Sequence, residues 1–236
     1  MNNWQKIWSN RKDTLDTVDA KDFRAVFAEL KRIDGFDLNG GVTPDSLIRQ
    51  HENLSDALNL SANETVFEVG CGAGANLYLF ARDGHKIGGL DYSATLIDIA
   101  KKILPAEKVS EQICAGADEL PTEKTFDAVF ANSVFAYFDD SDYACCVLEK
   151  MLLKSRRSIA VLDVYDATFE TQLTAERRRT IENYDERYKD LPKLFYPRSF
   201  FEDFAARHAL KISFAANELE NYGNAPFTYH CFMQKV

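Results

Sequence analysis

The chain has 236 residues, of which 46% are hydrophobic and 12% aromatic, and this length and composition suit one well-buried domain. Its 28 basic and 37 acidic residues give a formal net charge of −9, which disfavours nucleic acid and anionic membranes as partners and favours a small molecule. The sequence has no apolar run of 18 residues, and its first residues lack the apolar stretch of a secretion signal. We therefore expect a cytoplasmic protein, either a monomer or a weak homodimer.

The cysteines and histidines are not arranged for a structural metal or a disulfide framework. The five cysteines form no C-x-x-C pair, and none of the four histidines lies near a cysteine cluster. We expect no metal.

Helical spacing of apolar residues marks the first part of the chain. It predicts a helix over 22–33 and another over 47–58. Closer to the N-terminus, Trp4, Trp8 and Arg11 share one face of a further short helix.

From residue 65 onward, short β-branched or aromatic runs alternate with helical segments. This alternation predicts strands joined by crossover helices, and hence a Rossmann-like, doubly wound α/β sheet. The last two strands lack a helix between them, so they are expected to pair antiparallel. The predicted strands cover 65–69, 86–90, 111–115, 126–131, 158–162, 210–215 and 228–233, and the helices among them cover 76–82, 94–104, 142–153 and 198–208.

The strongest chemical signal follows the first predicted strand. Glu68-Val69-Gly70-Cys71-Gly72-Ala73-Gly74 places three glycines at alternate positions before a helix, where backbone must turn sharply and approach a ligand closely. The helix start offers free amides to an anionic group. Asp91 ends the second strand, where a carboxylate can accept hydrogen bonds from both hydroxyls of a ribose. Together they predict a site for a ribose-bearing cofactor.

Two cofactor classes fit this loop. Gly70, Gly72 and Ala75 formally meet the G-x-G-x-x-G/A pattern of dinucleotide-binding proteins, so an NAD(P)-dependent oxidoreductase is one alternative. Glu68 and the position of Gly74 count against it. The segment instead resembles the E/D-x-G-x-G-x-G signature of the class I S-adenosylmethionine-dependent methyltransferases. A noncatalytic protein that binds S-adenosylmethionine is the other alternative.

The resemblance is clearest over 65–165, and it implies an architecture for the whole chain. It implies a seven-stranded sheet with an antiparallel last strand, N-terminal helices and a helical cap insertion. Residues 1–236 would then form a single methyltransferase domain, in which 1–60 build a helical lid, 65–165 and 198–236 bind the cofactor, and 166–197 form the cap.

The resemblance also assigns residues to S-adenosylmethionine. Asp91 would bind its ribose and Tyr92 would flank adenine, with packing at the rim as the alternative role of Tyr92. The family usually has an aspartate on the adenine amino group where this chain has Gly116, so the backbone of Ala117 and the side chain of Asp118 are expected there. The expected cofactor residues are Glu68, Gly70, Cys71, Gly72, Gly74, Asp91, Tyr92, Ser93, Ala117, Asp118, Asn132, Ser133 and Tyr137.

Methyl transfer is an in-line displacement, for which a protein mainly supplies proximity, orientation and a dry pocket. A base is needed only where the acceptor must lose a proton, and His51 and His230 are the candidates, with a structural role as the alternative. The accepting atom is expected to be oxygen, less readily nitrogen.

The methyl acceptor is expected to be a small polar metabolite, with an anionic one included. The stretch from Glu176 to Arg198 carries seven basic and five acidic residues in an otherwise acidic chain. An amphipathic cap helix through 176–189 would place Ile181, Tyr184, Tyr188 and Leu191 on one face. In related methyltransferases an N-terminal aromatic and basic helix folds over the cofactor, so Trp8 and Arg11 are expected near the acceptor unless the tryptophans are packing anchors. The expected acceptor residues are Trp8, Arg11, Tyr165, Arg178, Tyr184, Tyr188 and Tyr196.

Overall fold

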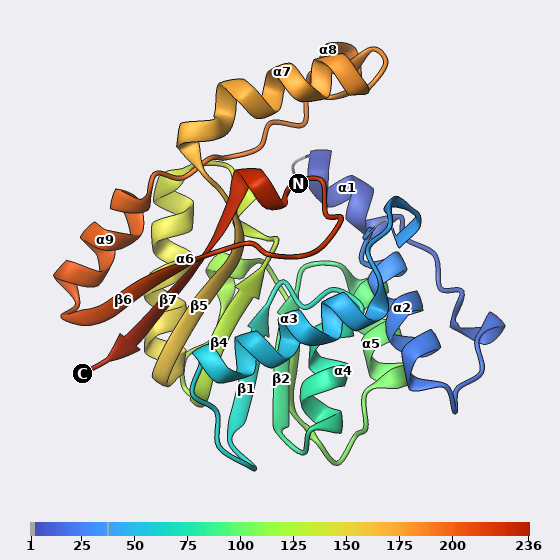
Figure 1. Ribbon diagram of the computed structural model, residues 1–236. Helices are drawn as coiled ribbons and strands as arrows, with labels where there is room; N and C mark the ends of the chain where they lie inside the picture. The colour runs from blue at the N-terminus through green and yellow to red at the C-terminus, as the bar shows by residue number, and fades with distance from the viewer. Residues whose placement is uncertain (1–2, 37) are drawn as a thin grey trace.

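A single mixed sheet organises the chain, of which the computed structural model describes residues 3–36 and 38–236 (Figure 1). Its strands are β1 Thr65–Val69, β2 Lys86–Asp91, β3 Val109–Cys114, β4 Phe126–Asn132, β5 Ser155–Tyr165, β6 Leu210–Ala216 and β7 Thr228–Lys235. They lie in the order β3-β2-β1-β4-β5-β7-β6. Because the chain runs from β1 out to β3 and then returns to β4 beside β1, the predicted doubly wound, seven-stranded sheet is confirmed.

Strand β7 runs against both of its neighbours. It pairs antiparallel with β5 and β6, whereas β1 with β2, β1 with β4, β2 with β3 and β4 with β5 are parallel pairs. The segment 217–227, which joins β6 to β7, holds a 3₁₀ turn at Ala225–Phe227 in place of a crossover helix. The predicted antiparallel pairing of the last two strands is confirmed.

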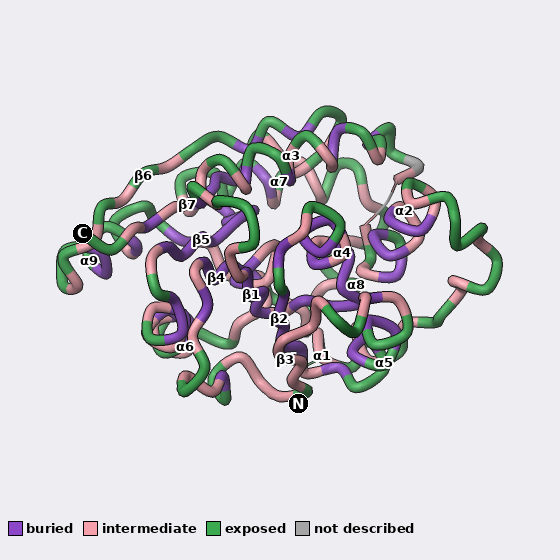
Figure 2. Tube along the Cα trace, turned by 90° about the horizontal axis from the view of Figure 1, so that it is seen from below, coloured by how far each residue is buried: buried purple, intermediate pink, exposed green. Residues whose placement is uncertain are grey.

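Helices cover both faces of the sheet, and their bounds are α2 Phe23–Ile33, α3 Pro44–Ala57, α4 Ala75–Arg82, α5 Ala94–Ile103, α6 Ser141–Lys154 and α9 Arg198–Arg207. Phe80 of α4 packs with Phe130 of β4 on one face, and Met151 of α6 and Phe204 of α9 pack with Val129 of β4 on the other. Successive residues of a strand point to opposite faces, so Val129 and Phe130 serve two separate cores. Figure 2 shows these strands as a buried centre surrounded by more exposed helices.

The segment between β5 and α9 forms an arm beyond the sheet, at the top of Figure 1. It contains α7 (Glu170–Thr180) and the short α8 (Tyr184–Arg187). The predicted continuous helix through 176–189 is wrong, because α7 ends at Thr180 and Asn183 adopts a left-handed φ of 54°. The expected shared helical face of Ile181, Tyr184, Tyr188 and Leu191 is therefore interrupted.

The N-terminal helix α1 (Asn3–Ser9) lies against this arm. Trp4 Nε1 donates a hydrogen bond to the carbonyl of Pro192 at 2.7 Å, and Asn3 Nδ2 donates to that of Asp190 at 3.3 Å. Arg11 follows the end of α1, so it does not extend the helical face of Trp4 and Trp8. The helix α1 and the arm are far apart in the sequence, and only the fold brings them into contact.

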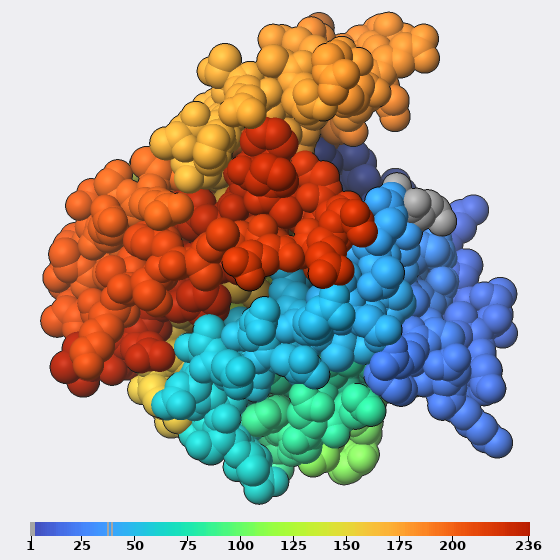
Figure 3. Space-filling view, viewed as in Figure 1, coloured from blue at the N-terminus to red at the C-terminus, as the bar shows by residue number. Residues whose placement is uncertain are grey.

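The segment 217–227 crosses to the N-terminal helices, and Figure 3 shows it (red) against the region of α3 (light blue). Tyr222 stacks on Phe36 with ring centroids 5.2 Å apart, and Arg49 Nη2 lies 3.0 Å from Glu220 Oε2. This crossing closes one side of the space beyond the strand ends. In the described part of the chain, no helix combines the length and apolar character needed to cross a bilayer.

Candidate active site

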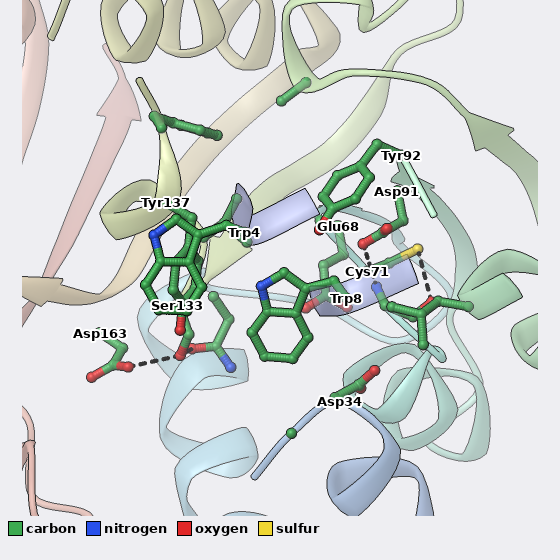
Figure 4. A pocket seen from close by; sticks show the side chains of 18 of the residues that line it. Trp4, Trp8, Asp34, Glu68, Cys71, Asp91, Tyr92, Ser133, Tyr137 and Asp163 are labelled. Atoms are coloured by element: carbon green, nitrogen blue, oxygen red, sulfur yellow. Dashed lines mark hydrogen bonds between the residues drawn. The ribbon is translucent and has the colours of Figure 1, made fainter. Parts of the chain in front are cut away.

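A pocket of about 680 Å³ opens at the carboxyl ends of β1, β2, β4 and β5 (Figure 4). It is lined mainly by the helix α1, the end of α2, the loops that follow the strands and the segment 217–227, with further residues from α3, α4, α5 and α6. Lys193, from the arm, completes the lining beside α1. The pocket thus lies where a doubly wound sheet places its ligands.

The glycine loop after β1 forms the wall nearest the centre of the sheet. Gly70 and Gly72 adopt φ values of 73° and 53°, in the left-handed region that favours glycine. A Cβ at Gly70 would overlap the side chain of Val134, and one at Gly72 would overlap the carboxylate of Asp34. Only glycine therefore lets this backbone turn at the strand end and face the pocket directly.

Asp91 ties this loop to the end of β2. Its Oδ2 accepts the backbone N–H of Gly72 at 2.9 Å, and its Oδ1 accepts that of Ser93 at 2.8 Å. Each oxygen keeps a lone pair for a further donor, and the residue lines the pocket beside Tyr92. Burial raises the pKa of the Asp91 carboxyl. The arrangement suits a ligand with two adjacent hydroxyls.

Glu68 presents an unmatched acceptor to the same pocket. Its Oε1 accepts from Asn76 Nδ2 at 2.5 Å, and Asn76 Oδ1 in turn accepts from Lys31 Nζ at 2.7 Å. Its Oε2 is buried and has no hydrogen-bond partner among the described residues. Burial raises the pKa of Glu68 to about 8. A bound ammonium or other cationic group would supply the missing donor and favour the charged carboxylate.

Asp34 is a site residue that the sequence did not indicate. It follows α2 and accepts the backbone N–H of Ala73, in the glycine loop, through Oδ1 at 2.6 Å. Burial raises its pKa to about 7. Its position just after a helix is that of an ordinary cap, and no local signal connects it with a loop 39 positions later.

The other half of the pocket is built around Asp163, near the end of β5. Its Oδ2 accepts hydrogen bonds from the hydroxyls of Ser133 at 2.7 Å and Tyr222 at 2.8 Å, and its Oδ1 accepts from Asn217 Nδ2 at 3.1 Å. Asp163 and Ser133 both have a left-handed φ, 56° and 58°, a conformation that costs a non-glycine residue on the order of 1 kcal/mol. Sequence reasoning proposed Ser133 but missed Asp163, Asn217 and Tyr222.

Most of the predicted cofactor residues line this pocket. They are Glu68, Gly70, Cys71, Gly72, Asp91, Tyr92, Ala117, Asp118, Asn132, Ser133 and Tyr137. Gly74 and Ser93 are instead the N-caps of α4 and α5. Asp118 Oδ1 accepts from the hydroxyl of Tyr143 at 2.8 Å, which orients it at the rim.

The predicted acceptor residues are divided between the pocket and the arm. Trp8 and Tyr165 line the pocket, and Arg11 lies next to it, with its guanidinium carbon 4.7 Å from the centroid of the Trp8 ring. Four others have their contacts outside the lining: Arg178 pairs with Asp185 at 2.9 Å, Tyr184 packs against Tyr188 and interacts with Arg177, and the hydroxyl of Tyr196 donates to the carbonyl of Phe135. Arg178, Tyr184, Tyr188 and Tyr196 are therefore not part of the pocket lining.

The two histidines lie outside the pocket lining. His51 Nε2 is 2.7 Å from Asp83 Oδ2, and its ring packs against Phe80, at the end of α4 remote from the glycine loop. His230 Nδ1 accepts the backbone N–H of Asp163 at 3.1 Å, and burial lowers its pKa. The contacts of His51 are thus an aspartate and a core ring, and its catalytic role stays a prediction that this position does not favour. His230 instead helps to position Asp163, through its hydrogen bond with the backbone of that residue.

Comparisons with known proteins agree with this geometry. A family model described as a methyltransferase domain matches residues 67–155, the part that contains the glycine loop, Asp91 and the end of β4. A malonyl-[acyl-carrier protein] O-methyltransferase from Priestia megaterium is 33% identical over 76 residues, 31% of this chain and 27% of that protein. A ubiquinone biosynthesis O-methyltransferase from Rhodopseudomonas palustris is 33% identical over 99 residues, 41% of this chain and 38% of its own length. The chain thus spans well under half the length of either relative.

Solved structures extend the likeness to most of the fold. Magnesium protoporphyrin IX methyltransferase from Synechocystis PCC 6803, with bound S-adenosylhomocysteine, superposes with a TM-score of 0.61 at 11% identity. The match covers 82% of this chain and 84% of that one. At such low identity the likeness concerns the fold alone.

Proposed function

We propose that this chain, which contains a class I S-adenosylmethionine-dependent methyltransferase domain, transfers the methyl group of S-adenosylmethionine to a small polar acceptor. The observation that carries the proposal is the wall of the pocket. Asp91 accepts hydrogen bonds from Gly72 in the glycine loop and from Ser93, and it keeps lone pairs for two hydroxyls. Oε2 of Glu68 has no hydrogen-bond partner among the described residues, so it can accept from a cationic donor. A ribose and an amino-acid ammonium are present together in this cofactor and are spaced along one molecule.

The residues of the pocket fit the cofactor part by part. Asp91 would accept from the ribose hydroxyls, and Glu68 would accept from the ammonium of the methionine moiety. Tyr92, the backbone of Ala117 and the side chain of Asp118 would surround adenine at the rim. When bound, the cofactor supplies an electrophilic methyl group on a sulfonium. The acidic lining and aromatic faces of the pocket suit that positive charge.

The protein would contribute to the reaction by orienting the reactants and by excluding water from the pocket. Trp4, Trp8 and Tyr137 pack edge to face, with Tyr137 centroids 4.8 Å from Trp4 and 5.7 Å from Trp8, and they form an apolar wall near the strand ends. Such a wall excludes water from a displacement reaction and limits the directions from which an acceptor can approach. The helix α1 would serve as the lid.

The accepting atom is proposed to be oxygen. The half of the pocket around Asp163 offers acceptor oxygens from Asp163 and Tyr222, which suit the donor of a hydroxyl group. Both relatives named above are O-methyltransferases, which supports the same choice. The acceptor is proposed to be polar, with an anionic one included.

The wider organisation belongs to the same proposal. Residues 1–236 would act as one domain, with 1–60 as lid, 65–165 and 198–236 as cofactor core, and 166–197 as cap. The net charge of −9 supports a small-molecule acceptor over nucleic acid or membrane. A cytoplasmic monomer or weak homodimer remains part of the proposal.

Two measurements test the proposal against its alternatives. S-adenosylhomocysteine should raise the melting temperature of the protein, and NAD should not. Stabilisation by NAD alone would favour the oxidoreductase instead. Incubation with S-adenosylmethionine and a panel of hydroxylated and carboxylated metabolites should then add the mass of one methyl group to an acceptor. Binding of the cofactor without any such product would favour the noncatalytic protein.

A further inference from the structure

Lys193 is the cation in the acceptor half of the pocket. The pocket-lining residues include two lysines, Lys31 and Lys193, against seven acidic residues. Lys31 lies by the glycine loop and donates to Asn76 Oδ1. Lys193 comes from the arm and is surrounded by the rings of Trp4, Tyr137 and Tyr165, with Nζ 5.6, 5.3 and 4.9 Å from their centroids. Cation–π attraction holds the charged form of the lysine in an aromatic enclosure of this kind.

Among the described residues, none supplies a carboxylate that pairs with this ammonium. Within residues 3–36 and 38–236, Lys193 Nζ forms no ion pair within 4.0 Å, and its hydrogen bond is to the hydroxyl of Tyr165, at 3.1 Å. An ammonium has three donors, so the pocket side retains capacity for an anion. Asp163 attracts it only at longer range.

A second positive charge reinforces the first. Arg177, on α7, donates through Nη2 to the same Tyr165 hydroxyl at 3.0 Å and to Asn224 Oδ1 at 3.1 Å. Lys193 and Arg177 therefore meet at one neutral oxygen, with no carboxylate between them. Two cations held on a neutral group are electrostatically unfavourable unless an anion is bound beside them.

We propose that Lys193, with Tyr165 and Arg177, forms the subsite for an anionic group of the methyl acceptor, and that the acceptor is a small carboxylic acid with a planar or aromatic body. The rings of Trp4 and Tyr137 flank the same subsite, which is why a planar body fits. This inference rests on the proposed function and specifies the substrate class of that site. It makes Lys193 a specificity-determining residue.

The charge of Lys193 depends on its surroundings. Burial lowers its pKa to about 7; Arg177 acts in the same direction and Asp163 opposes it. Burial raises the pKa values of the Tyr137 and Tyr165 hydroxyls, whose rings surround Lys193, so both hydroxyls are neutral in this range. A bound carboxylate favours the charged ammonium, so affinity should be full well below pH 7, fall through pH 7 and weaken by up to about tenfold per pH unit above it.

Matched pairs of probes test the subsite. Benzoate against benzamide, and salicylate against salicylamide, have nearly the same shape and differ in charge. Binding would be measured by calorimetry at pH 6 and pH 8 and constant ionic strength, with and without saturating S-adenosylhomocysteine. The proteins would be the unaltered chain, Lys193→Met, Lys193→Arg and, as a matched control, Lys189→Met, which removes an exposed lysine of the same arm.

We expect the unaltered protein to bind at least one acid about tenfold more tightly than its amide at pH 6, with most of that preference lost at pH 8. Lys193→Met should lose the preference, Lys189→Met should keep it, and Lys193→Arg should keep it at pH 8 because its guanidinium stays charged. Equal binding of acid and amide by the unaltered protein at pH 6, or a preference that survives in Lys193→Met, would overturn the assignment. If Lys193→Met fails to fold, the acid-over-amide preferences of the unaltered protein and of Lys193→Arg at pH 6 and pH 8 decide whether Lys193 binds the acid. If the unaltered protein does not bind S-adenosylhomocysteine, that result counts against the proposed function. It does not count against the subsite, because the titrations of the acids and amides without S-adenosylhomocysteine still measure it.

Discussion

Replacement of Asp91 separates a role in the fold from a role in binding the cofactor. Its two oxygens accept the backbone N–H groups of Gly72 and Ser93 at 2.9 and 2.8 Å, and only 6% of the residue is exposed. Asp91→Ala leaves both donors buried without an acceptor, at about 1–3 kcal/mol each, so unfolding free energy should fall by about 2–6 kcal/mol. Asp91→Asn keeps one amide oxygen and should lose about half as much.

The effect on the cofactor should be separate from this loss. A hydrogen bond to a charged acceptor contributes about 1.5–3 kcal/mol, and two ribose hydroxyls are expected to donate to Asp91. Because 1.4 kcal/mol is about tenfold in affinity, loss of even one such bond in Asp91→Asn should weaken S-adenosylhomocysteine binding by about tenfold to a hundredfold.

Urea denaturation and calorimetric titration of S-adenosylhomocysteine measure the two effects on the same variants. Asp98→Ala is the matched control, since Asp98 is an exposed aspartate on α5 whose partner is the surface Lys101. It should change stability by less than about 1 kcal/mol and leave affinity unaltered. Affinity of Asp91→Asn within the error of the unaltered protein, with the expected loss of stability, would refute the ribose role. Unchanged stability in Asp91→Ala would refute the two backbone hydrogen bonds.

Three other substitutions probe the pocket and its surroundings. Gly70→Ala forces a left-handed alanine against Val134 and should lower unfolding free energy in urea by more than about 1 kcal/mol, whereas Gly223→Ala, which has open space around it, should be nearly neutral. Glu68 has a pKa of about 8 in the folded protein against an ordinary 4.5. Without ligand, its contribution to the free energy of unfolding is therefore present below pH 4.5 and is lost as the pH rises toward 8. Glu68→Gln should flatten this fall in stability, measured by urea denaturation at several pH values, and an equally steep fall would contradict the raised pKa of Glu68. His51→Ala should lower the melting temperature while leaving methyl transfer per folded molecule unchanged; a selective loss of turnover would restore the histidine as a catalytic candidate.

Local sequence signals were sufficient for the sheet and for one wall of the site. The alternation of strand-like and helical runs from residue 65 predicted the order of elements, because periodicity records which face of each element is buried. The glycine loop and Asp91 were predictable for a related reason. The backbone conformation at Gly70 and Gly72 disfavours a side chain, and Asp91 is the last residue of its strand, so each signal lies within a few residues of the feature that it marks.

Helix ends and residue roles were less predictable. A helical spacing of apolar residues continued past Thr180, yet Asn183 turned the chain and separated the tyrosines of the arm from the pocket. His51 has the chemistry of a base, but its contacts with Asp83 and Phe80 are set by how α3 packs on α4. Residue type alone does not reveal such partners, since the same side chain serves either role.

The acceptor half of the pocket was decided by tertiary structure alone. Asp163, Tyr222 and Lys193 come from a strand end, a closing segment and the arm, and they meet because those elements pack around the end of the sheet. Contacts between distant segments depend on packing and leave no periodic trace in the chain, whereas turns, strands and glycine conformations depend on neighbouring residues. The sequence by itself thus determined the sheet and the wall expected to hold the cofactor, and only the fold decided which charges face the acceptor.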